Sequence, residues 1–452
     1  MIAGPGTEFF IINFRCRSNV ETDYTRKGDK DKMNFFEKGP GILSGLKDCP
    51  KYFSPATAST GIIAAIMGTT GPLVMVLSAA EDGMMSQEQA IAWVFSIYFF
   101  GGIITLIMAL WYKQPICGAW SIPGLLLVGV VLAEFSINEA VGAYMISGLI
   151  VLLLGVSGYI KKVMLWLPQP IIMGMIAGAM LRFGIGIADG IEASPLIALL
   201  TLLGWLLLTR FIPRIPGVLG ALVFGIITAV AVGTADFSVF EFSFARPMVF
   251  VPAFSFDAFL SIAIPLSIVV IGAENTQALG TLMSQDYKPP VNTMLIISGL
   301  GGIVAGFFGG HNANIAGPMT AITSGPESGP KEGRYVASVV NGILFGAAGV
   351  MAGAAASFIG ALPGSMVSVI VGLAMIGVLT NAFSTAFSGR YQLGAFFALI
   401  IAASGVSFFK IAAPFWALLG GVVISLILES EQFLRGWEFN NNGADETLES
   451  KI

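Results

Sequence analysis

The stretch Phe307–Pro326, FFGGHNANIAGPMTAITSGP, decides the fold of this chain. It lies inside a long hydrophobic region, and it contains the only histidine of the sequence, His311, together with Asn312 and Asn314. Its apolar, helix-compatible part is about ten residues, roughly half of what ~30 Å of hydrocarbon requires. We predict an extended lead from His311 to Asn314, followed by a half-helix that begins near Ile315.

A broken segment of this kind predicts a function. Irregular backbone survives at membrane depth only where it lies against protein or lines a watery cavity. A half-helix there points unpaired N–H groups and the positive end of its dipole at whatever fills the cavity, which is typical of the substrate site of a transporter. The alternative is a re-entrant kink whose polar groups are satisfied internally.

The composition excludes an ordinary soluble domain. Mean hydropathy is +0.83, 55% of the residues are hydrophobic, and only 11% are charged. The single histidine and the cysteines Cys16, Cys49 and Cys117 have no metal-ligand spacing, so we expect no metal site, cofactor or disulfide framework. No basic stripe indicates a nucleic-acid partner. No cleavable signal peptide is expected, because the first long apolar run begins after residue 54.

Apolar segments recur along the whole chain, and we expect an all-α membrane protein with about fourteen transmembrane segments. The expected spans are 55–79, 89–111, 116–132, 138–158, 164–182, 194–210, 214–233, 257–283, 291–308, 311–325, 335–355, 359–380, 391–408 and 411–429. The third and tenth are short, and each is predicted to be an extended stretch plus a half-helix. Residues 1–53 are an expected tail and lead-in, and 430–452 an expected second tail.

The basic loop residues predict the orientation, because cytoplasmic loops are enriched in Lys and Arg. With the first loop outside, the inside loops hold nine of them and the outside loops three. The nine are Lys113, Lys161, Lys162, Arg210, Arg214, Lys288, Lys331, Arg334 and Arg390; the three are Arg182, Arg246 and Lys410. We therefore expect a multi-pass protein of the inner membrane with both termini in the cytoplasm.

Weak internal repeats indicate that the chain has two equivalent halves, 54–233 and 257–429. At an offset of about 195 residues, a Leu-Pro pair, an Ala-Met pair, two glycines and one proline recur in the same order. The pairs are Leu167-Pro168 with Leu362-Pro363, Ala179-Met180 with Ala374-Met375, Gly148 with Gly342, Gly155 with Gly349, and Pro216 with Pro414. Seven spans per half is an odd number, so the second half must be inverted, and inverted repeats with broken helices predict a site at the repeat interface.

The first-half counterpart of the opening stretch is CGAWSIPGLLL at 117–127. Its Pro123-Gly124 pair suits an extended lead into a second half-helix, and Trp120 and Ser121 should then face the other broken segment. Trp120 could instead be an interfacial anchor. Thr69 and Thr70 of the first span either close the site from the other repeat or merely bond the preceding helical turn.

Glu274 is the one acid that falls well inside an expected span. A charge at a helix centre costs about 2.5–3.5 kcal/mol on insertion scales, and such residues usually mark ion or proton pathways. Burial favours the neutral acid, which suits a proton carrier. Asn275 and Gln277 extend the polar cluster, and Gln277 could share the face of Glu274. The alternative is a protonated Glu274 that bonds a neighbouring helix for packing. His311 could likewise shuttle protons or only bond backbone at the helix break.

At these residues the chain resembles the benzoate/proton symporter family, from about Leu46 to Leu428. The matching pieces are GTTGPL at 68–73, AWSIPG at 119–124, GGHNANIA at 309–316, SGPESGPKEGRY at 324–335 and ASGVSFFKIAAPFWALLGG at 403–421. The family resembles a branch of the uracil-permease superfamily. The resemblance implies seven plus seven inverted spans, with a core domain of spans 1–4 and 8–11 and a gate domain of spans 5–7 and 12–14. It also implies that Ser121, Glu274, Asn275 and Asn314 line the site.

The eighth span departs from the family pattern. Benzoate symporters usually carry Gln-Asn followed by Pro-Gly, whereas this chain has Glu274, Asn275, Thr276, Gln277 and Ala278, and a glutamate there is more like the nucleobase permeases. We expect a proton symporter of a small, aromatic carboxylate such as benzoate. A nucleobase/proton symporter and an uncoupled anion channel or uniporter are the alternatives. An enzyme is not expected, and a homodimer is left open.

Overall fold

The computed structural model describes residues 36–158, 168–212, 216–409 and 411–431. All of them belong to one compact unit, Phe35–Ile452. Both expected tails lie largely outside the described residues, as do Leu167 and the loop cations Lys161, Lys162, Arg214 and Lys410.

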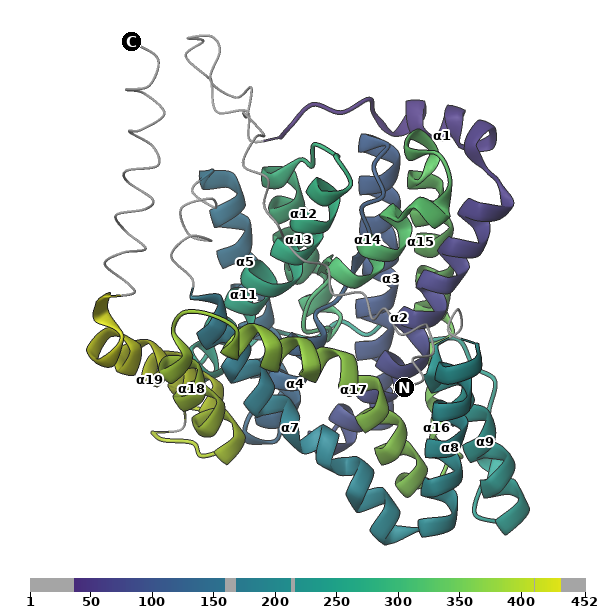
Figure 1. The fold of residues 1–452 in the computed structure, drawn as a ribbon, viewed down its shortest axis with the longest axis vertical. Helices are drawn as coiled ribbons and strands as arrows, with labels where there is room; N and C mark the ends of the chain where they lie inside the picture. The colour runs from purple at the N-terminus through teal and green to yellow at the C-terminus, as the bar shows by residue number, and fades with distance from the viewer. Residues whose placement is uncertain (1–35, 159–167, 213–215, 410, 432–452) are drawn as a thin grey trace, which may run out of the picture. The chain divides into compact units, whose positions relative to one another are not determined.

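Helices dominate the described residues (Figure 1). In the first half they are α1 Ile42–Tyr52, α2 Pro55–Asp82, α3 Gln87–Tyr112, α4 Ile122–Val131, α5 Ile137–Ser157, α7 Gln169–Ala193, α8 Pro195–Phe211 and α9 Gly217–Val232. In the second half they are α10 Phe256–Ala258, α11 Ile264–Val269, α12 Thr276–Ser284, α13 Val291–Phe307, α14 Gly317–Ser324, α15 Tyr335–Val350, α16 Ala352–Gly360, α17 Gly364–Phe387, α18 Gln392–Ser404 and α19 Ala413–Leu428. Two π-helical segments, η3 Phe259–Ala263 and η4 Val270–Asn275, join α10, α11 and α12 into one continuous rod.

Short polar signals in the sequence set where several helices begin. Ser54, Ser86 and Ser136 are the N-caps of α2, α3 and α5, and each forms a capping box with the residue three positions later. Pro168 and Pro363, matched in the predicted repeat, are the N-caps of α7 and α17. The helix α17 begins at Gly364 rather than at 359, because α15 is followed by the separate helix α16.

Two strands occur at the broken segments, β1 Gly118–Ala119 and β2 Asn314–Ile315. They pair antiparallel, with Gly118 opposite Ile315 and Ala119 opposite Asn314. This pairing moves the start of the second half-helix to Gly317, two residues later than the predicted Ile315, because Asn314 and Ile315 are held in extended backbone. Each broken segment is therefore an extended stretch plus a half-helix.

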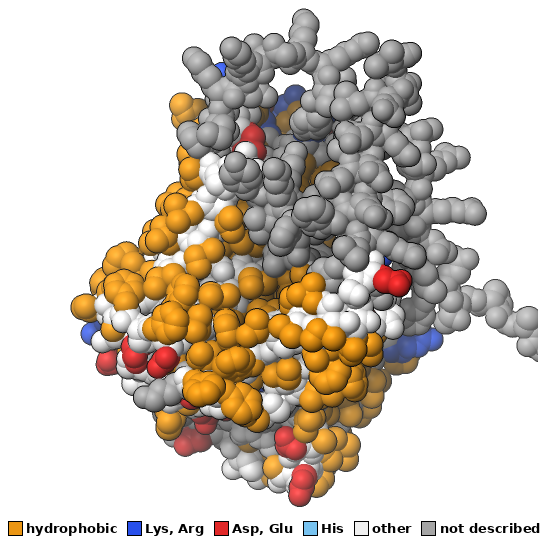
Figure 2. All heavy atoms as spheres, turned by 90° about the vertical axis from the view of Figure 1, so that its left-hand side faces the viewer, with side chains coloured by type: hydrophobic (Ala, Val, Ile, Leu, Met, Phe, Trp, Pro, Cys, Tyr) orange, Lys and Arg blue, Asp and Glu red, His pale blue; other side chains and the backbone are white. Residues whose placement is uncertain are grey.

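Seven described helices are long and apolar enough to cross a membrane by length and composition. They are Pro55–Asp82, Gln87–Tyr112, Ile137–Ser157, Gln169–Ala193, Phe256–Ser284, Lys331–Val350 and Gly364–Phe387. Six other apolar helical stretches have 10–17 residues. Figure 2 shows a broad hydrophobic surface. Many apolar side chains are exposed, among them Phe396 of α18 and Leu419 and Leu426 of α19. A surface this apolar is suited to lipid.

The helices pack in two sets. The first helix set comprises α2–α5 and α10–α15, in which α3 packs on α15 and α5 packs on α13. The second helix set comprises α7–α9 and α17–α19, in which α7 packs on α17 and α18, α8 on α9, and α18 on α19 (Figure 1). The strands β1 and β2 lie within the first set, against α3 and α13.

Candidate substrate site

A cavity of about 630 Å³ lies between the two helix sets. The first set contributes α2, α4, α12, α14 and the π-helix η4, and the second set contributes α7, α9 and α17. The lining residues are Met67, Gly68, Thr70, Gly71, Pro72, Trp120, Ile122, Pro123, Gln169, Met173, Ile176, Pro216, Val218, Gly272, Ala273, Glu274, Thr276, Gln277, Ala316, Pro318, Met319, Ile322, Ala374, Gly377, Val378, Asn381, Ala382 and Thr385. Most are apolar, and Glu274 is the one ionisable side chain among them.

Glu274 lies where the two half-helices begin. Its carboxyl group interacts with the backbone N–H of Gly317, the hydroxyl of Ser121 and the backbone N–H of Ile122. Gly317 is the first residue of α14, and Ile122 is the first residue of α4. The first N–H groups of a helix have no intrahelical partner and carry the positive end of its dipole. Two helix starts therefore converge on one carboxyl group that is 5% exposed.

The pairing of β1 with β2 explains this convergence. Antiparallel strands run past each other in opposite directions, and here each one leads directly into a half-helix. The N–H of Ala316 also donates to the carbonyl of Cys117 at 2.9 Å, which extends the backbone tie by one residue. Ser121 ends the first lead as the N-cap of α4, because its Oγ accepts from the N–H of Gly124 at 3.0 Å.

Glu274 itself lies in the π-helical turn Val270–Asn275. Such a turn leaves backbone carbonyls without regular partners, and π-bulges are frequent at functional sites. Side chains satisfy these carbonyls: Asn275 Nδ2 donates to the carbonyl of Val270 at 2.9 Å, and Thr276 Oγ1 to that of Ile271 at 2.8 Å. Gln169 of the second helix set donates from Nε2 to the carbonyl of Gly272 at 3.3 Å.

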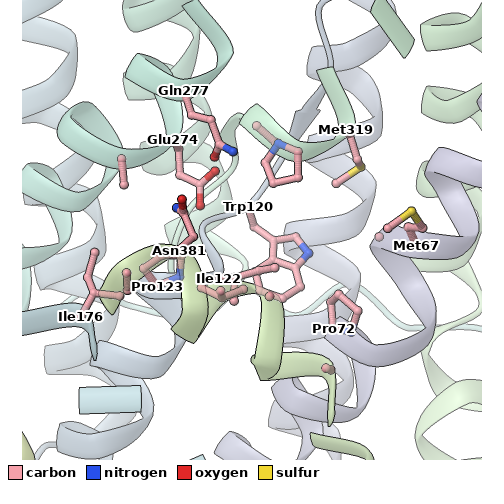
Figure 3. A pocket seen from close by; sticks show the side chains of 18 of the residues that line it. Met67, Pro72, Trp120, Ile122, Pro123, Ile176, Glu274, Gln277, Met319 and Asn381 are labelled. Carbon is pink, nitrogen blue, oxygen red and sulfur yellow. The ribbon is translucent and has the colours of Figure 1, made fainter. Parts of the chain in front are cut away.

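Figure 3 shows Glu274 and Gln277 pointing into the cavity from the same side, with Asn381 of α17 pointing toward Glu274. Gln277 packs closely on the first residue of α14, since a Cβ on Gly317 would lie 2.5 Å from Gln277 Oε1. Trp120 forms the adjoining wall and is 3% exposed. Its Nε1 has no hydrogen-bond partner among the described residues. The cavity thus has one polar end and otherwise apolar walls.

His311 lies behind this wall and is fully buried. The indole N–H of Trp93 donates to His311 Nδ1 at 3.0 Å, so Nδ1 carries no proton. His311 Nε2 then donates to the carbonyl of Ser121 at 3.0 Å. Asn312 supports the same residue, because its Oδ1 accepts from the N–H of Ser121 at 3.0 Å. Both side chains hold the lead into α4 in place, and neither lines the cavity.

Asn275 and Asn314 are also buried away from the cavity. Ser298 of α13 connects them: its Oγ donates to Asn275 Oδ1 at 3.1 Å and accepts from the N–H of Ile315 at 3.0 Å. Asn314 Nδ2 donates to the carbonyl of Ile315 at 3.0 Å, while its Oδ1 has no partner among the described residues. These two amides therefore organise the inner packing of the first helix set.

The two threonines differ in position. Thr70 lines the cavity and Thr69 does not. Each hydroxyl donates to a carbonyl four residues earlier, Thr69 to Ala65 and Thr70 to Ile66, both at 2.7 Å. This is the local backbone bond expected of threonine in a membrane helix. Of the ten predicted site residues, the structure brings Trp120, Glu274, Gln277 and Thr70 together around the cavity, with Ser121 directly behind Glu274.

Sequence reasoning missed the polar residues that the second helix set contributes, namely Gln169, Asn381 and Thr385. Asn381 had a usable signal, because an amide inside an apolar span is as unusual as the glutamate at 274. Gln169 follows Pro168 at the start of α7 and could not be told from an ordinary loop residue. Within the described residues no group of three His, Cys, Asp or Glu side chains is placed to hold a metal ion.

Comparison with known proteins identifies relatives over almost the whole membrane region. The family model for benzoate membrane transport proteins matches residues 51–427. The benzoate membrane transport protein of Acinetobacter baylyi is 28% identical over 385 residues, covering 85% of this chain and 98% of the relative. The inner membrane protein YdcO of Escherichia coli is 29% identical over 385 residues, covering 84% and 98%.

Solved structures of low sequence identity share the fold. The transmembrane domain of the cyanobacterial bicarbonate transporter BicA has a TM-score of 0.57 at 16% identity, and the match covers 81% of this chain and 97% of that one. The structure of SLC26A9 has a TM-score of 0.60 at 15% identity, covering 86% and 69%. Murine Slc26a9, an anion transporter in the inward-facing state, also scores 0.60 at 14% identity, covering 86% and 71%. The fold is thus that of membrane transporters.

Proposed function

Because the chain belongs to the family of benzoate membrane transport proteins, we propose that it is a secondary active transporter that carries a small aromatic carboxylate, such as benzoate, together with a proton. The family assignment confirms the prediction of a membrane transporter rather than an enzyme. The substrate class and the coupling to protons are the proposal. Its main support is the position of Glu274 at the two helix starts, inside a cavity with otherwise apolar walls.

The cavity suits a molecule with one anionic group and an apolar ring. Helix starts favour a negative charge by about 0.3–1 kcal/mol when exposed and by up to ~2 kcal/mol in partly buried geometry. The ring would lie against apolar walls such as Ile176, Met319 and the indole of Trp120. No Lys, Arg or His occurs among the lining residues, so the helix starts are the source of positive potential for the anion.

Proton coupling follows from the chemistry of Glu274. A neutral carboxyl group can donate a hydrogen bond to an anionic substrate, whereas an ionised one repels it. Proton and anion therefore bind together, and by linkage each tightens the binding of the other. Coupling of this kind needs one titratable group in contact with the cavity, and Glu274 is the one described lining residue that qualifies.

We also propose that the chain has fourteen spans arranged as seven plus seven inverted repeats. The matched glycines support the repeat. A Cβ on Gly148 of α5 would lie 2.8 Å from the carbonyl oxygen of Gly299 on α13, and one on Gly342 of α15 would lie 3.1 Å from that of Gly102 on α3. The matched helices α5 and α15 thus use matched glycines to pack closely against a helix of the opposite half, α13 and α3 respectively.

In this arrangement the first helix set is the core domain and the second helix set is the gate domain. The N-caps at Pro168 and Pro363 open the gate helices α7 and α17, which pack against each other. Both termini lie in the cytoplasm, and a homodimer is the proposed assembly. The orientation is tested with cysteines at two exposed positions, Glu88 in the first turn of α3 and Glu332 in the 3-10 helical turn Lys331–Gly333. An impermeant thiol reagent added outside should label Glu88→Cys and spare Glu332→Cys, and the reverse pattern would contradict the orientation.

The function is tested by uptake of labelled benzoate into proteoliposomes. An inward proton gradient should drive accumulation above equilibrium, and unlabelled benzoate should compete. Competition by uracil or xanthine instead would identify the nucleobase alternative, which the amides of Gln277 and Asn381 beside Glu274 favour. A flux that equilibrates benzoate but ignores the proton gradient would identify the channel or uniporter.

A further inference from the structure

The two half-helix starts do not face an empty cavity, because a carboxyl group of the protein already lies there. Glu274 interacts with the N–H groups of Gly317 and Ile122 and with the hydroxyl of Ser121, which are the groups that would hold a carboxylate substrate. These donors belong to backbone and to one N-cap, and they are fixed by the pairing of β1 with β2. The number of donors is therefore limited, and it matches a single carboxylate.

Two ionised carboxylates cannot share this place. Like charges in a water-poor site repel strongly, and one of two adjacent carboxyl groups then takes up a proton. No compensating cation is available from the lining residues. The elements packed against η4 are α7, α11, α12, α13, α14 and β2, and their only charged side chains are Arg182, Asp189 and Glu192 in the second half of α7. His311 is neutral and bonded on both nitrogens.

We propose that the ionised side chain of Glu274 occupies the place that the substrate carboxylate takes, so that the protein's own carboxylate is a tethered competitor of the substrate. This inference rests on the proposed function and specifies its binding step. Protonation removes the negative charge that the helix starts stabilise. The neutral carboxyl group of Glu274 then moves away from the helix starts and hydrogen-bonds to the adjoining side-chain amides. Gln277 and Asn381 flank it there.

The charge balance of the exchange follows. One proton from water binds to a Glu274 carboxylate oxygen, forming one O–H bond, and one substrate anion enters the vacated place. The site carries one negative charge before the exchange and one after it. The competitor therefore predicts that one proton binds together with each monovalent anion, with no net charge moved by the site.

The inference can be tested without transport. Glu274→Ala removes the tethered carboxylate and leaves the helix starts vacant, so that free formate should bind in its place. At neutral pH formate should raise the thermal unfolding midpoint of Glu274→Ala by about 2 °C or more, the size expected when a ligand exceeds its Kd about tenfold. Formate should not stabilise the wild type at this pH. Acidification should make the wild type responsive, because it neutralises the competitor.

Gln277→Ala is the matched control, since it widens the same end of the cavity while Glu274 stays in place. It should show no response to formate at neutral pH. If Glu274→Ala does not fold, Glu274→Gln provides the second measurement, and its benzoate affinity should be equal at pH 5 and pH 8. An equal response to formate in wild type and Glu274→Ala, or no response in either, overturns the inference. So does a pH-dependent benzoate affinity in Glu274→Gln. None of these results bears on gradient-driven uptake by the wild type, which tests the proposed function separately.

Discussion

Among the described residues two buried carboxylates lie at helix starts, and one of them, Glu274, lines the cavity between the helix sets. Glu429 at the end of α19 is 8% exposed and accepts hydrogen bonds from the N–H groups of Leu393 at 3.1 Å and Gly394 at 3.0 Å, in the first turn of α18. Ser425 Oγ donates to it at 2.7 Å. Glu274 is 5% exposed and its carboxyl group interacts with the N–H groups that begin α4 and α14, and it also borders a cavity of about 630 Å³.

The comparison shows that burial and helix dipoles do not by themselves make a carboxylate functional. Glu429 joins α18 to α19 within one helix set, and neither it nor its donors line the cavity between the helix sets. The donors of Glu274 are open to exchange because the cavity adjoins them. Access to the donors, rather than depth, distinguishes the two roles.

The largest expected effect is the loss of proton-driven accumulation when Glu274, the carboxylate at the cavity, is replaced. Glu274→Gln keeps the shape of the side chain but cannot take up a proton. The variant should still bind benzoate and exchange it across the membrane, yet fail to concentrate it under an imposed proton gradient. Uptake into proteoliposomes with and without the gradient measures this. Glu192→Gln, at an exposed position on α7, is the control and should accumulate benzoate normally. Accumulation by Glu274→Gln at the wild-type level would eliminate Glu274 as the proton carrier.

The second prediction concerns the other carboxylate, Glu429, which we expect to matter for stability and not for proton coupling. Glu429→Ala leaves the N–H groups of Leu393 and Gly394 at the start of α18 without their acceptor, and for the buried group of Gly394 this costs about 1–3 kcal/mol. The thermal unfolding midpoint should fall, whereas the folded fraction should keep its proton-driven uptake. Glu431→Ala removes an exposed acid from the same end of the chain and should leave the midpoint unchanged. Loss of proton coupling in folded Glu429→Ala would show that the two carboxylates do not differ in the way proposed.

The smallest expected effect concerns His311, a titratable side chain that lies behind the cavity wall and does not line the cavity. His311→Gln keeps one donor and one acceptor, but these cannot reproduce both the bond from Trp93 and the bond to Ser121. We expect a loss of stability of about 0.5–1.5 kcal/mol, the size of one hydrogen bond. Benzoate accumulation under a proton gradient should persist, with the same pH dependence as the wild type. A variant of normal stability that binds benzoate without pH dependence would instead assign the coupled proton to His311.

The sequence was sufficient to predict the two broken segments and the acid beside them, for physical reasons. A histidine and two asparagines within an apolar region are costly unless the backbone is broken there, so the sequence alone predicts a broken segment after Phe307. Which of its polar side chains line the cavity was not predictable. Asn275 and Asn314 are as unusual in composition as Glu274, but Ser298 and local carbonyls satisfy them inside the helix packing.

Other features depend on contacts that no local pattern encodes. The π-helical turn at Val270–Asn275 changes which way side chains face, and its extra residue leaves no mark in the hydrophobic pattern. Gln169 and Asn381 reach the cavity only because α7 and α17 pack together on its far side. Glu429 falls at the end of a span, where an acid is usually solvated, and only the tertiary structure gives it the N–H groups of α18.

The pairing of β1 with β2 has a consequence for how the selectivity of such a protein can change. The two strands fix the spacing between the starts of α4 and α14 through backbone hydrogen bonds, so the part of the site that we propose binds a carboxylate is made largely of main chain. Side-chain substitutions leave main-chain donors in place. The apolar walls consist of side chains such as Ile176 and Met319, which single substitutions can enlarge, narrow or make polar. If the proposed function holds, mutation can therefore change which ring is accepted while the preference for a carboxylate is inherited unchanged.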